Sequence, residues 1–249
     1  MTLGLARARG AGGRLEARTL RIADLYCGAG GAAMGIYRAC EAAGVDCLIT
    51  GVDIEPQPRY PAFHNNDYAR NISFVQGNAL EFDLSGFDAV WASPPCQAFT
   101  RSSTRSKRER HADLVPSTRD MLARSGLPYI IENVIGAPLR PDAQLCGQAF
   151  GLRTYRHRIF ESNILLLQPP HEKHAHVTLP AIGVYQTFNK AYMISLVKHR
   201  FRTVDGRIAM GIGWMNRDEL AEAIPPAYSE FLWSQLLLYI SASTSLFQK

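Results

Sequence analysis

The sequence predicts an α/β protein built on a doubly wound sheet. Short apolar patterns typical of strands alternate with longer patterns of helical spacing, and glycines or polar residues follow the ends of several strand patterns. The chain has 249 residues, of which 47% are hydrophobic and 20% charged, so it can bury one large core. We expect the loops after the strands to line one crevice, where sheets of this kind bind ligands.

Net charge, cysteine content and the lack of long apolar stretches indicate which kind of protein and which compartment the sequence fits. The net charge is +5, but residues 1–21 contribute +4 of it through five arginines against Glu16, leaving +1 for the remaining 228 residues. Residues 1–20 are rich in Gly, Ala and Arg, so we expect a flexible basic arm. The five cysteines contain no C-x-x-C pair, which favours a reducing compartment. No apolar stretch reaches the roughly 18 residues of a membrane span and no secretory signal pattern is present, so we expect a cytoplasmic protein.

The first strand pattern leads into a glycine turn. Residues 20–26 predict a strand, and helical spacing after the turn ends at Gly44. Gly28, Gly30 and Ala33 fit G-x-G-x-x-(G/A), a pattern that lets the backbone approach a ligand closely at a helix N-terminus. The turn is compatible with NAD, FAD or S-adenosylmethionine, and also with a structural turn that binds nothing.

Two further strand patterns extend this unit. Residues 47–52 predict a strand that ends at Asp53, about where a carboxylate can accept hydrogen bonds from ribose hydroxyls. Residues 72–75 predict a third strand, which Asn78 follows. Together with the glycine turn, these residues favour a nucleotide-like cofactor.

A fourth strand pattern, residues 87–92, runs into Ser93-Pro94-Pro95-Cys96-Gln97. Proline restricts its own backbone and that of the preceding residue, so Cys96 stands on a rigid corner that suits a nucleophile. A packed, inert thiol is the alternative, because free cysteine is usually a small buried hydrophobe. A basic run from Arg101 to Arg119 follows, and both a solvated loop and a contact with nucleic-acid phosphates are compatible with it.

Two later stretches are expected to place further charged residues in the same crevice, at the ends of predicted strands. A helix is expected over residues 113–125, and the strand pattern of residues 129–131 then delivers Glu132, either a paired structural group or a site acid with a raised pKa. In residues 154–160, extended alternation would send Arg156 and Arg158 to one face, where they could hold an anion or a base edge, although an exposed strand face is equally compatible.

The remainder of the chain offers fewer signals. We expect one more strand at residues 164–167 and then a histidine-rich patch, His171, His174 and His176. No thiol or carboxylate cluster matches these histidines, so we expect no metal site. A short helical pattern at residues 219–222 precedes a terminal amphipathic helix over residues 229–240, which would close the sheet.

Taken in order, these stretches resemble the motifs of the cytosine-5 methyltransferase family. The matching stretches are Asp24-Leu25-Tyr26-Cys27-Gly28-Ala29-Gly30-Gly31, Pro94-Pro95-Cys96-Gln97, Glu132-Asn133-Val134, Arg156-x-Arg158 and Ala223-Ile224-Pro225-Pro226. The resemblance covers about residues 21–160 and 210–242. It implies a Rossmann-like, S-adenosylmethionine-dependent methyltransferase domain formed by residues 21–160 and 206–249, with a short target-recognition region at residues 161–205 similar to that of compact phage and bacterial enzymes.

The resemblance also implies a reaction on a cytosine flipped out of duplex DNA. Cys96 would add to carbon 6 of the ring, Glu132 would act at ring nitrogen 3, and both Arg156 and Arg158 would stabilise developing charge and hold the base. Carbon 5 could then take the methyl group of S-adenosylmethionine.

Binding residues follow from the same resemblance. The cofactor-binding set is Asp24, Tyr26, Cys27, Gly28, Gly30, Asp53, Ile54, Asn78 and Pro94, and the DNA-binding set is Gln97, Arg101, Arg105, Lys107 and Arg108. The chain departs from the family pattern at Asn78, Thr154 and Glu222, which by the resemblance correspond to the adenine contact, the packing of the base pocket and the local cofactor geometry.

The expected partner is double-stranded DNA, bound by a monomer, in a restriction-modification or phage setting. The alternative substrate is tRNA, because the Phe99-Thr100 pair after Gln97 resembles the tRNA branch of the family. A catalytically silent nucleic-acid-binding relative is the third interpretation.

Overall fold

The computed structural model describes residues 18–61, 70–99, 112–171, 173–174, 178–179, 193–196 and 201–246. Its strands are β1 (Leu20–Leu25), β2 (Cys47–Asp53), β3 (Ile72–Gln76), β4 (Ala89–Ala92), β5 (Tyr129–Asn133), β6 (Ala143–Leu145), β7 (Arg158–Ser162), β8 (Thr178–Leu179) and β9 (Met193–Ile194). Its helices are α1 (Gly31–Ala43), α3 (Val115–Ser125), α4 (Thr203–Met210), α5 (Arg217–Glu222) and α6 (Pro226–Leu246), with the 3-10 turns η3 (Ala79–Glu81) and η4 (Gly147–Phe150).

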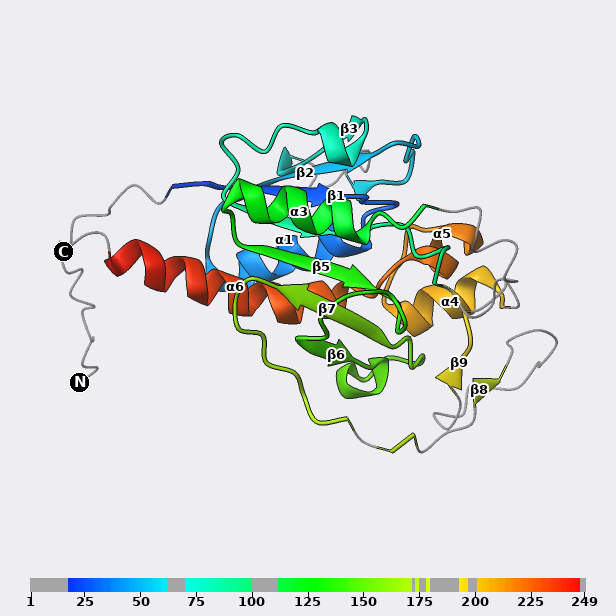
Figure 1. Ribbon diagram of the computed structural model, residues 1–249. Helices are drawn as coiled ribbons and strands as arrows, with labels where there is room; N and C mark the ends of the chain where they lie inside the picture. Colours follow the sequence, from blue (N-terminus) through cyan, green and yellow to red (C-terminus); the bar gives the residue numbers. More distant parts are fainter. Residues whose placement is uncertain are drawn as a thin grey trace, which may run out of the picture.

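Seven of the strands form one sheet in the order β3-β2-β1-β4-β5-β7-β6 (Figure 1). Strands β1 to β5 pair in parallel, whereas β7 runs antiparallel to both β5 and β6. β8 and β9 pair separately. The predicted doubly wound, Rossmann-like α/β fold is therefore confirmed.

The glycine turn and the helix after it form as the sequence predicts. Gly30 caps the N-terminus of α1 with φ at 81°, and Gly44 caps its C-terminus with φ at 66°. Both values lie in the left-handed region, which costs glycine little. The Gly44 N–H donates to the carbonyls of Cys40 and Glu41 and so terminates the helix.

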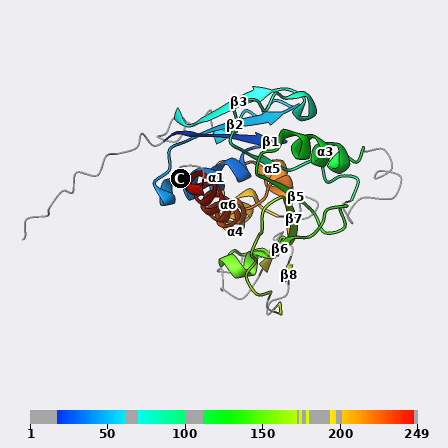
Figure 2. The ribbon, with the colours of Figure 1, turned by 60° about the vertical axis from the view of Figure 1, so that its left-hand side comes forward.

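The sheet is covered on both faces. Ile22, Trp91, Ile130 and Phe160 pack with α1 and α6 on one face, and Leu25, Val90 and Ile131 pack with α3 on the other. α1 and α6 lie side by side (Figures 1 and 2).

Gly35 is what allows α1 and α6 to come so close. A Cβ at Gly35 would lie 2.1 Å from the Pro226 carbonyl oxygen and 2.1 Å from Ser229 Oγ. The Ser229 hydroxyl in turn donates to the Ala32 carbonyl at 3.0 Å.

α6 is longer than the terminal helix that the sequence predicts. It begins three residues before the predicted start and extends beyond the predicted end.

The strand predicted at residues 164–167 is wrong. Its alternation is real, since Ile164 and Leu166 are buried and Leu165 and Leu167 are exposed. However, the backbone of Leu167 pairs with the side chain of Gln235 in α6 instead of with another strand. The sequence also gave no indication of β6, which is only three residues long, or of α4.

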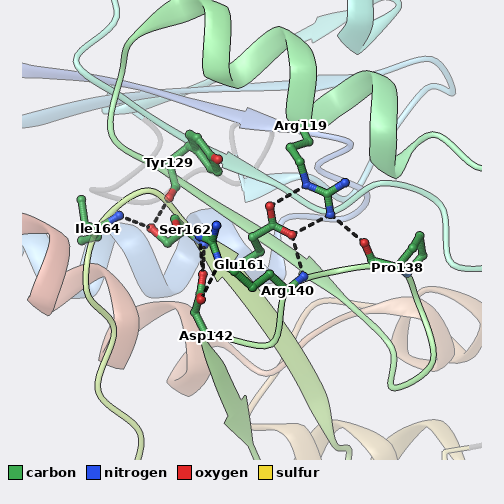
Figure 3. A network of polar contacts seen from close by, with 8 residues as sticks. All are labelled: Arg119, Tyr129, Pro138, Arg140, Asp142, Glu161, Ser162 and Ile164. Carbon is green, nitrogen blue, oxygen red and sulfur yellow. Dashed lines mark hydrogen bonds and ion pairs between the residues drawn. The ribbon is translucent and has the colours of Figure 1, made fainter.

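A polar network joins β7 to α3 (Figure 3). Glu161 of β7 is buried, and Arg119 of α3 holds it with two hydrogen bonds, at 2.6 Å and 2.7 Å. The Arg140 N–H donates to the same carboxylate, and the Arg140 side chain pairs with Asp142. Burial opposes the charged form, but these partners outweigh it and hold the pKa of Glu161 below its usual range.

This network corrects two expectations. Arg119, counted in the basic run for which a solvated loop and a phosphate contact were both compatible, is an internal partner of Glu161. Glu161 was assigned to the target-recognition region, yet it belongs to the central sheet. β7 continues to Ser162 and α4 begins at Thr203, so both predicted domain boundaries, after residues 160 and 205, fall inside an element.

Within the part of the chain that the structure describes, no helix combines the length and apolar character needed to cross a membrane.

Replacing Arg119 tests how much this network contributes to the free energy of unfolding. We expect Arg119→Gln to lower the free energy of unfolding by about 3 kcal/mol at neutral pH, because Glu161 loses its charge partner inside the fold. The control is Arg124→Gln, an exposed arginine of the same helix, for which we expect a change under about 0.5 kcal/mol. Urea denaturation measures both.

The contribution of Glu161 to the free energy of unfolding depends on pH in a direction that follows from its lowered pKa. A carboxylate whose pKa is lowered in the folded state stabilises the protein above its usual pKa, and that contribution is lost as the pH falls. The difference between the wild type and Arg119→Gln should therefore shrink below about pH 4. A difference that stays constant down to pH 3 would contradict an ionised Glu161.

Candidate active site

A cavity of about 310 Å³ lies at the carboxyl ends of the parallel strands. The predicted site residues that line it are Asp24, Tyr26, Cys27, Gly28, Asp53, Ile54, Pro94, Cys96, Gln97, Glu132 and Arg158. They come from the ends of β1, β2, β4 and β5 and from the start of β7. Because β7 is antiparallel, its first residue reaches the same edge that the other strands reach with their last residues.

The glycine turn and Asp53 form one end of this cavity. The Gly28 N–H donates to Asp53 Oδ2 at 2.9 Å, and the Glu55 N–H donates to Asp53 Oδ1 at 3.0 Å. A Cβ at Gly28 would meet no atom within 4 Å, so the space over the turn is open. Tyr26 has a φ of 56°, a strained value for a residue with a side chain, and its hydroxyl is 2.9 Å from Thr118 Oγ1.

Asp24 is a fully buried acid on the wall of the cavity. The Tyr60 hydroxyl donates to its Oδ2 at 3.3 Å, whereas the buried Oδ1 has no hydrogen-bond partner among the described residues. Burial raises the pKa of Asp24 to about 8, the Tyr60 hydrogen bond opposes this rise, and the nearby charge of Asp53 adds to it. An unmatched acceptor in such a place favours a cationic hydrogen-bond donor as its partner.

The corner that carries Cys96 is held from both neighbouring strands. The Ser93 N–H donates to the Leu25 carbonyl at 3.0 Å, extending the pairing of β4 with β1. On the other side, Asn133 Nδ2 donates to the Pro94 carbonyl at 2.9 Å. Cys96 itself is half-buried, is not in a disulfide, and accepts a turn hydrogen bond at its carbonyl from the Phe99 N–H.

Glu132 and Arg158 form an ion pair beside this corner. Arg158 Nε lies 2.8 Å from Glu132 Oε1, and both side chains are largely buried. Glu132 faces Phe160 in the register of β5 and β7, so Arg158, two residues from Phe160, shares its face of the sheet. Burial raises the pKa of Glu132, while Arg158, Ser93 and Arg156 oppose that rise.

Arg156 does not share an extended strand face with Arg158, contrary to expectation. β7 begins only at Arg158, and Arg156 has a φ of 35°. Arg156 is outside the cavity lining; its Nε donates to the Ala223 carbonyl and its Nη2 to the Ala221 carbonyl, each at 2.8 Å. Burial, followed by repulsion from Arg158, lowers its pKa to about 9, and attraction to nearby groups such as Glu132 opposes this fall.

Two other predicted residues also lie outside the cavity lining. Gly30 starts α1 and backs onto Pro61, where a Cβ would lie 2.2 Å from the ring. Asn78 caps η3, because its Oδ1 accepts from the Leu80 N–H at 3.1 Å and its Nδ2 donates to Glu81.

The predicted DNA contacts divide into two groups. Gln97 lines the cavity, and its Oε1 is buried without a hydrogen-bond partner. Arg101, Arg105, Lys107 and Arg108 lie outside the described residues.

Several lining residues were not predicted. They are Ala29, Gly31, Ala32, Glu55, Gln57, Ser93, Pro95, Met215, Glu219, Glu222, Ala223 and Ile224. Ser93 could have been found, since it adjoins Pro94, and it hydrogen-bonds the Glu132 carboxylate and accepts from Trp91 Nε1. The sequence around Glu219 does not indicate a site residue, because the position of Glu219 at the cavity depends on the capping box of α5 and on its ion pair with Arg59.

Comparison with known proteins gives limited matches. No family model matches the chain. A curated relative, the type II methyltransferase M1.BsuMI of Bacillus subtilis (strain 168), is 25% identical over 140 residues, which are 49% of this chain and 33% of that protein. The chain thus covers about a third of the length of that relative.

Solved structures support the fold. The methyltransferase EhMeth of Entamoeba histolytica superposes with a TM-score of 0.53 at 12% identity, over 91% of this chain and 99% of that one. An RNA methyltransferase of Salinibacter ruber, in complex with S-adenosyl-L-homocysteine, reaches a TM-score of only 0.35 at 17% identity, over 61% of this chain and 84% of that one. The likeness to EhMeth shows that the chain has the Rossmann-like fold of that methyltransferase.

Proposed function

We propose that this protein is an S-adenosylmethionine-dependent DNA cytosine-5 methyltransferase. The observation that carries the proposal is one cavity that Cys96, Glu132 and Arg158 line together with residues of the glycine turn and Asp53. A nucleophile, an acid and a fixed positive charge are thereby within reach of a site suited to a nucleotide-like cofactor. The names of the two matched proteins, M1.BsuMI and EhMeth, support methyl transfer as the reaction.

The cavity fits S-adenosylmethionine group by group. The unpartnered Asp24 Oδ1 would accept from the ammonium of the methionine part, and Asp53 would accept from the ribose hydroxyls. The open space over Gly28 leaves room for the ligand to approach the backbone. Ile54, whose side chain is 67% exposed, offers an apolar surface for the adenine ring. Tyr26, Cys27 and Pro94 complete this wall.

Cys96 would act as the nucleophile. Its thiolate adds to carbon 6 of the cytosine, and the π electrons of the ring move toward carbon 5 and nitrogen 3. The bound cofactor supplies an electrophilic methyl group, which leaves S-adenosylhomocysteine when it is transferred. A base then removes the carbon-5 proton, the electrons of that bond re-form the double bond between carbons 5 and 6 and expel Cys96 as its thiolate, and nitrogen 3 returns its proton to Glu132.

Glu132 would hold the proton that nitrogen 3 needs. Neutral cytosine presents a lone pair there, so the acid must be a donor, and the raised pKa of Glu132 makes its protonated form more accessible. Ser93 and Arg158 fix the direction of the carboxyl group. Arg158 also lines the cavity and would stabilise negative charge on the ring.

Arg156 takes a different role in this proposal. It is a positioning residue, because its guanidinium ties the carbonyls of Ala221 and Ala223 to the start of β7. The Tyr228 hydroxyl donates to the Arg156 carbonyl at 3.0 Å and locks the same turn. Through Ala223, which lines the cavity, Arg156 would set the shape of the base pocket.

The substrate we favour is duplex DNA with its target cytosine flipped into the cavity. Carbon 6 is inaccessible inside a base pair, so extrusion is required. The buried, unpartnered Oε1 of Gln97 would accept from the flipped base or from the neighbouring strand. Arg101, Arg105, Lys107 and Arg108 would contact phosphates, and the chain between β7 and α4 would read the target. A restriction-modification or phage role, in the cytoplasm and as a monomer, belongs to the same proposal.

The second candidate substrate is tRNA. Phe99 follows Gln97 as in the tRNA branch that the sequence resembles, and it packs partly buried against the core that contains Leu25 and Ile131. The cavity chemistry is the same for either nucleic acid, because only the cytosine enters it.

Transfer of a labelled methyl group tests the proposal. With tritiated S-adenosylmethionine, we expect label in cytosine of unmethylated duplex DNA and not in bulk tRNA. Cys96→Ala should reduce the label to background, because the proposed nucleophile that adds to carbon 6 is lost. Cys47→Ala is the matched control, since this buried thiol stands at the opposite end of β2 and its loss should change the rate by less than about threefold.

The possible results separate the alternatives. Label in tRNA alone would move the protein to the second candidate. Full transfer by Cys96→Ala would contradict the covalent mechanism, and binding of nucleic acid without any transfer would indicate the silent relative.

Replacing Asp24 tests cofactor binding apart from catalysis. We expect Asp24→Asn to weaken binding of S-adenosylhomocysteine by roughly 10-fold to 100-fold, because a charged hydrogen bond to the ammonium is lost. The exposed Asp120→Asn is the matched control. Isothermal titration calorimetry measures both.

This binding should also depend on pH. The ammonium needs the ionised acid, so wild-type affinity should rise as the pH increases toward the pKa of Asp24, about 8, and then level off. Asp24→Asn should remove that rise. Unchanged affinity in this variant would place the ammonium elsewhere.

A further inference from the structure

Four metal-ligating side chains meet outside the proposed active site. They are Cys146, directly after β6; His157, directly before β7; and His171 and His174, in the chain beyond β7. One ligand atom from each lies within 4.8 Å of the others. The expectation of no metal site missed this cluster, because Cys146 and His157 are far in sequence from the histidine pair and only the fold brings them together. His176, the third histidine of the patch, lies outside the described residues.

Three of the six distances between these ligand atoms lie within about 0.4 Å of the edges of a zinc tetrahedron. With Zn–N near 2.0–2.1 Å and Zn–S near 2.3 Å, tetrahedral geometry places two ligand nitrogens about 3.3 Å apart and a nitrogen and a sulfur about 3.6 Å apart. Here His157 Nε2 lies 2.9 Å from His171 Nε2 and 3.2 Å from His174 Nε2. Cys146 Sγ lies 3.7 Å from His174 Nε2.

The orientation of the groups also favours a cation. Three imidazoles turn the same nitrogen, Nε2, toward one another, and the cysteine sulfur completes the group. Hydrogen bonds alone satisfy this arrangement poorly, since each neutral imidazole carries only one proton for its two nitrogens. Tyr155 stacks on His174, with ring centroids 3.7 Å apart, and restricts the rotation of that imidazole.

We propose that Cys146, His157, His171 and His174 bind one Zn²⁺ ion in a structural site. Four protein ligands of the Cys-His₃ type fill a tetrahedral shell and leave no position for a substrate, unlike a catalytic zinc site. Binding takes the thiolate of Cys146 and releases its proton. The ion joins the loop between β6 and β7 to the chain around residues 171–174.

This site would support the proposed active site without taking part in the chemistry. The His157 carbonyl accepts from Arg158 Nη1 at 2.9 Å, and Arg158 is the partner of Glu132. Fixing His157 through its ring therefore restrains the residue before the catalytic arginine. The metal would also anchor the start of the segment proposed to read the target. Metal binding itself does not rest on the proposed function.

Metal content and cobalt spectroscopy test this proposal. The full-length protein purified without chelators should contain one equivalent of zinc by mass spectrometry. After exchange for Co²⁺, we expect the intense visible bands of a tetrahedral site and a near-ultraviolet band from thiolate-to-cobalt charge transfer. Cys146→Ser should abolish the near-ultraviolet band, and Cys96→Ser, the control for a thiol outside the cluster, should retain it.

A second variant guards against a loss of folding. His171 is exposed, so His171→Asn should keep the circular dichroism spectrum of the wild type while lowering metal affinity at least about 10-fold. A chelator should lower the melting temperature of the wild type more than that of this variant. Absence of bound zinc or cobalt in the folded wild type, or a thiolate band that survives in Cys146→Ser, would overturn the proposal whether or not the protein transfers methyl groups.

Discussion

The hydrogen bond from Asn133 Nδ2 to the Pro94 carbonyl is the constraint on which the site depends. It crosses from the end of β5 to the corner after β4, and the Ser93 N–H holds the other side of that corner to β1. A cysteine that is proposed to attack one ring carbon needs a backbone that does not move, and here two prolines and two neighbouring strands fix it. The same strand end that supplies Asn133 supplies Glu132, so the proposed nucleophile and the proposed acid are held in one register.

The buried charges around the proposed site are largely balanced. Glu132 pairs with Arg158, and Arg156 is held by carbonyl oxygens. Asp24 keeps one unmatched oxygen. Among the described residues, the two non-glycine positions with positive φ, Tyr26 and Arg156, belong to the same region. Strain and unmatched polar atoms cost stability, and Tyr26, Asp24 and Gln97 carry such features in the lining of the cavity where binding and catalysis are proposed.

The sequence predicted the fold well where local chemistry decides the structure. Gly44 ends α1 and Gly126 ends α3, because the residue after each helix adopts the left-handed conformation that favours glycine. The apolar runs of β1, β2 and β5 are typical of buried strands in a parallel sheet. The proposed site was predictable in the same way, since its residues follow strand ends. Leu165 and Leu167 misled the prediction because alternating burial does not require a partner strand. The placement of Arg156 was wrong and the Cys146 cluster was missed, because their surroundings depend on segments far apart in sequence.

The most direct test of the central claim is covalent trapping of Cys96. With a duplex that carries 5-fluorocytosine as its target base, the reaction should stall after methyl transfer. Carbon 5 then carries fluorine in place of the proton that must be removed, so the sulfur of Cys96 cannot be expelled. We expect a protein–DNA adduct that survives denaturing electrophoresis, needs S-adenosylmethionine, and maps by peptide mass spectrometry to Cys96. Label transfer to ordinary cytosine without any such adduct, or an adduct on another residue, would contradict the account.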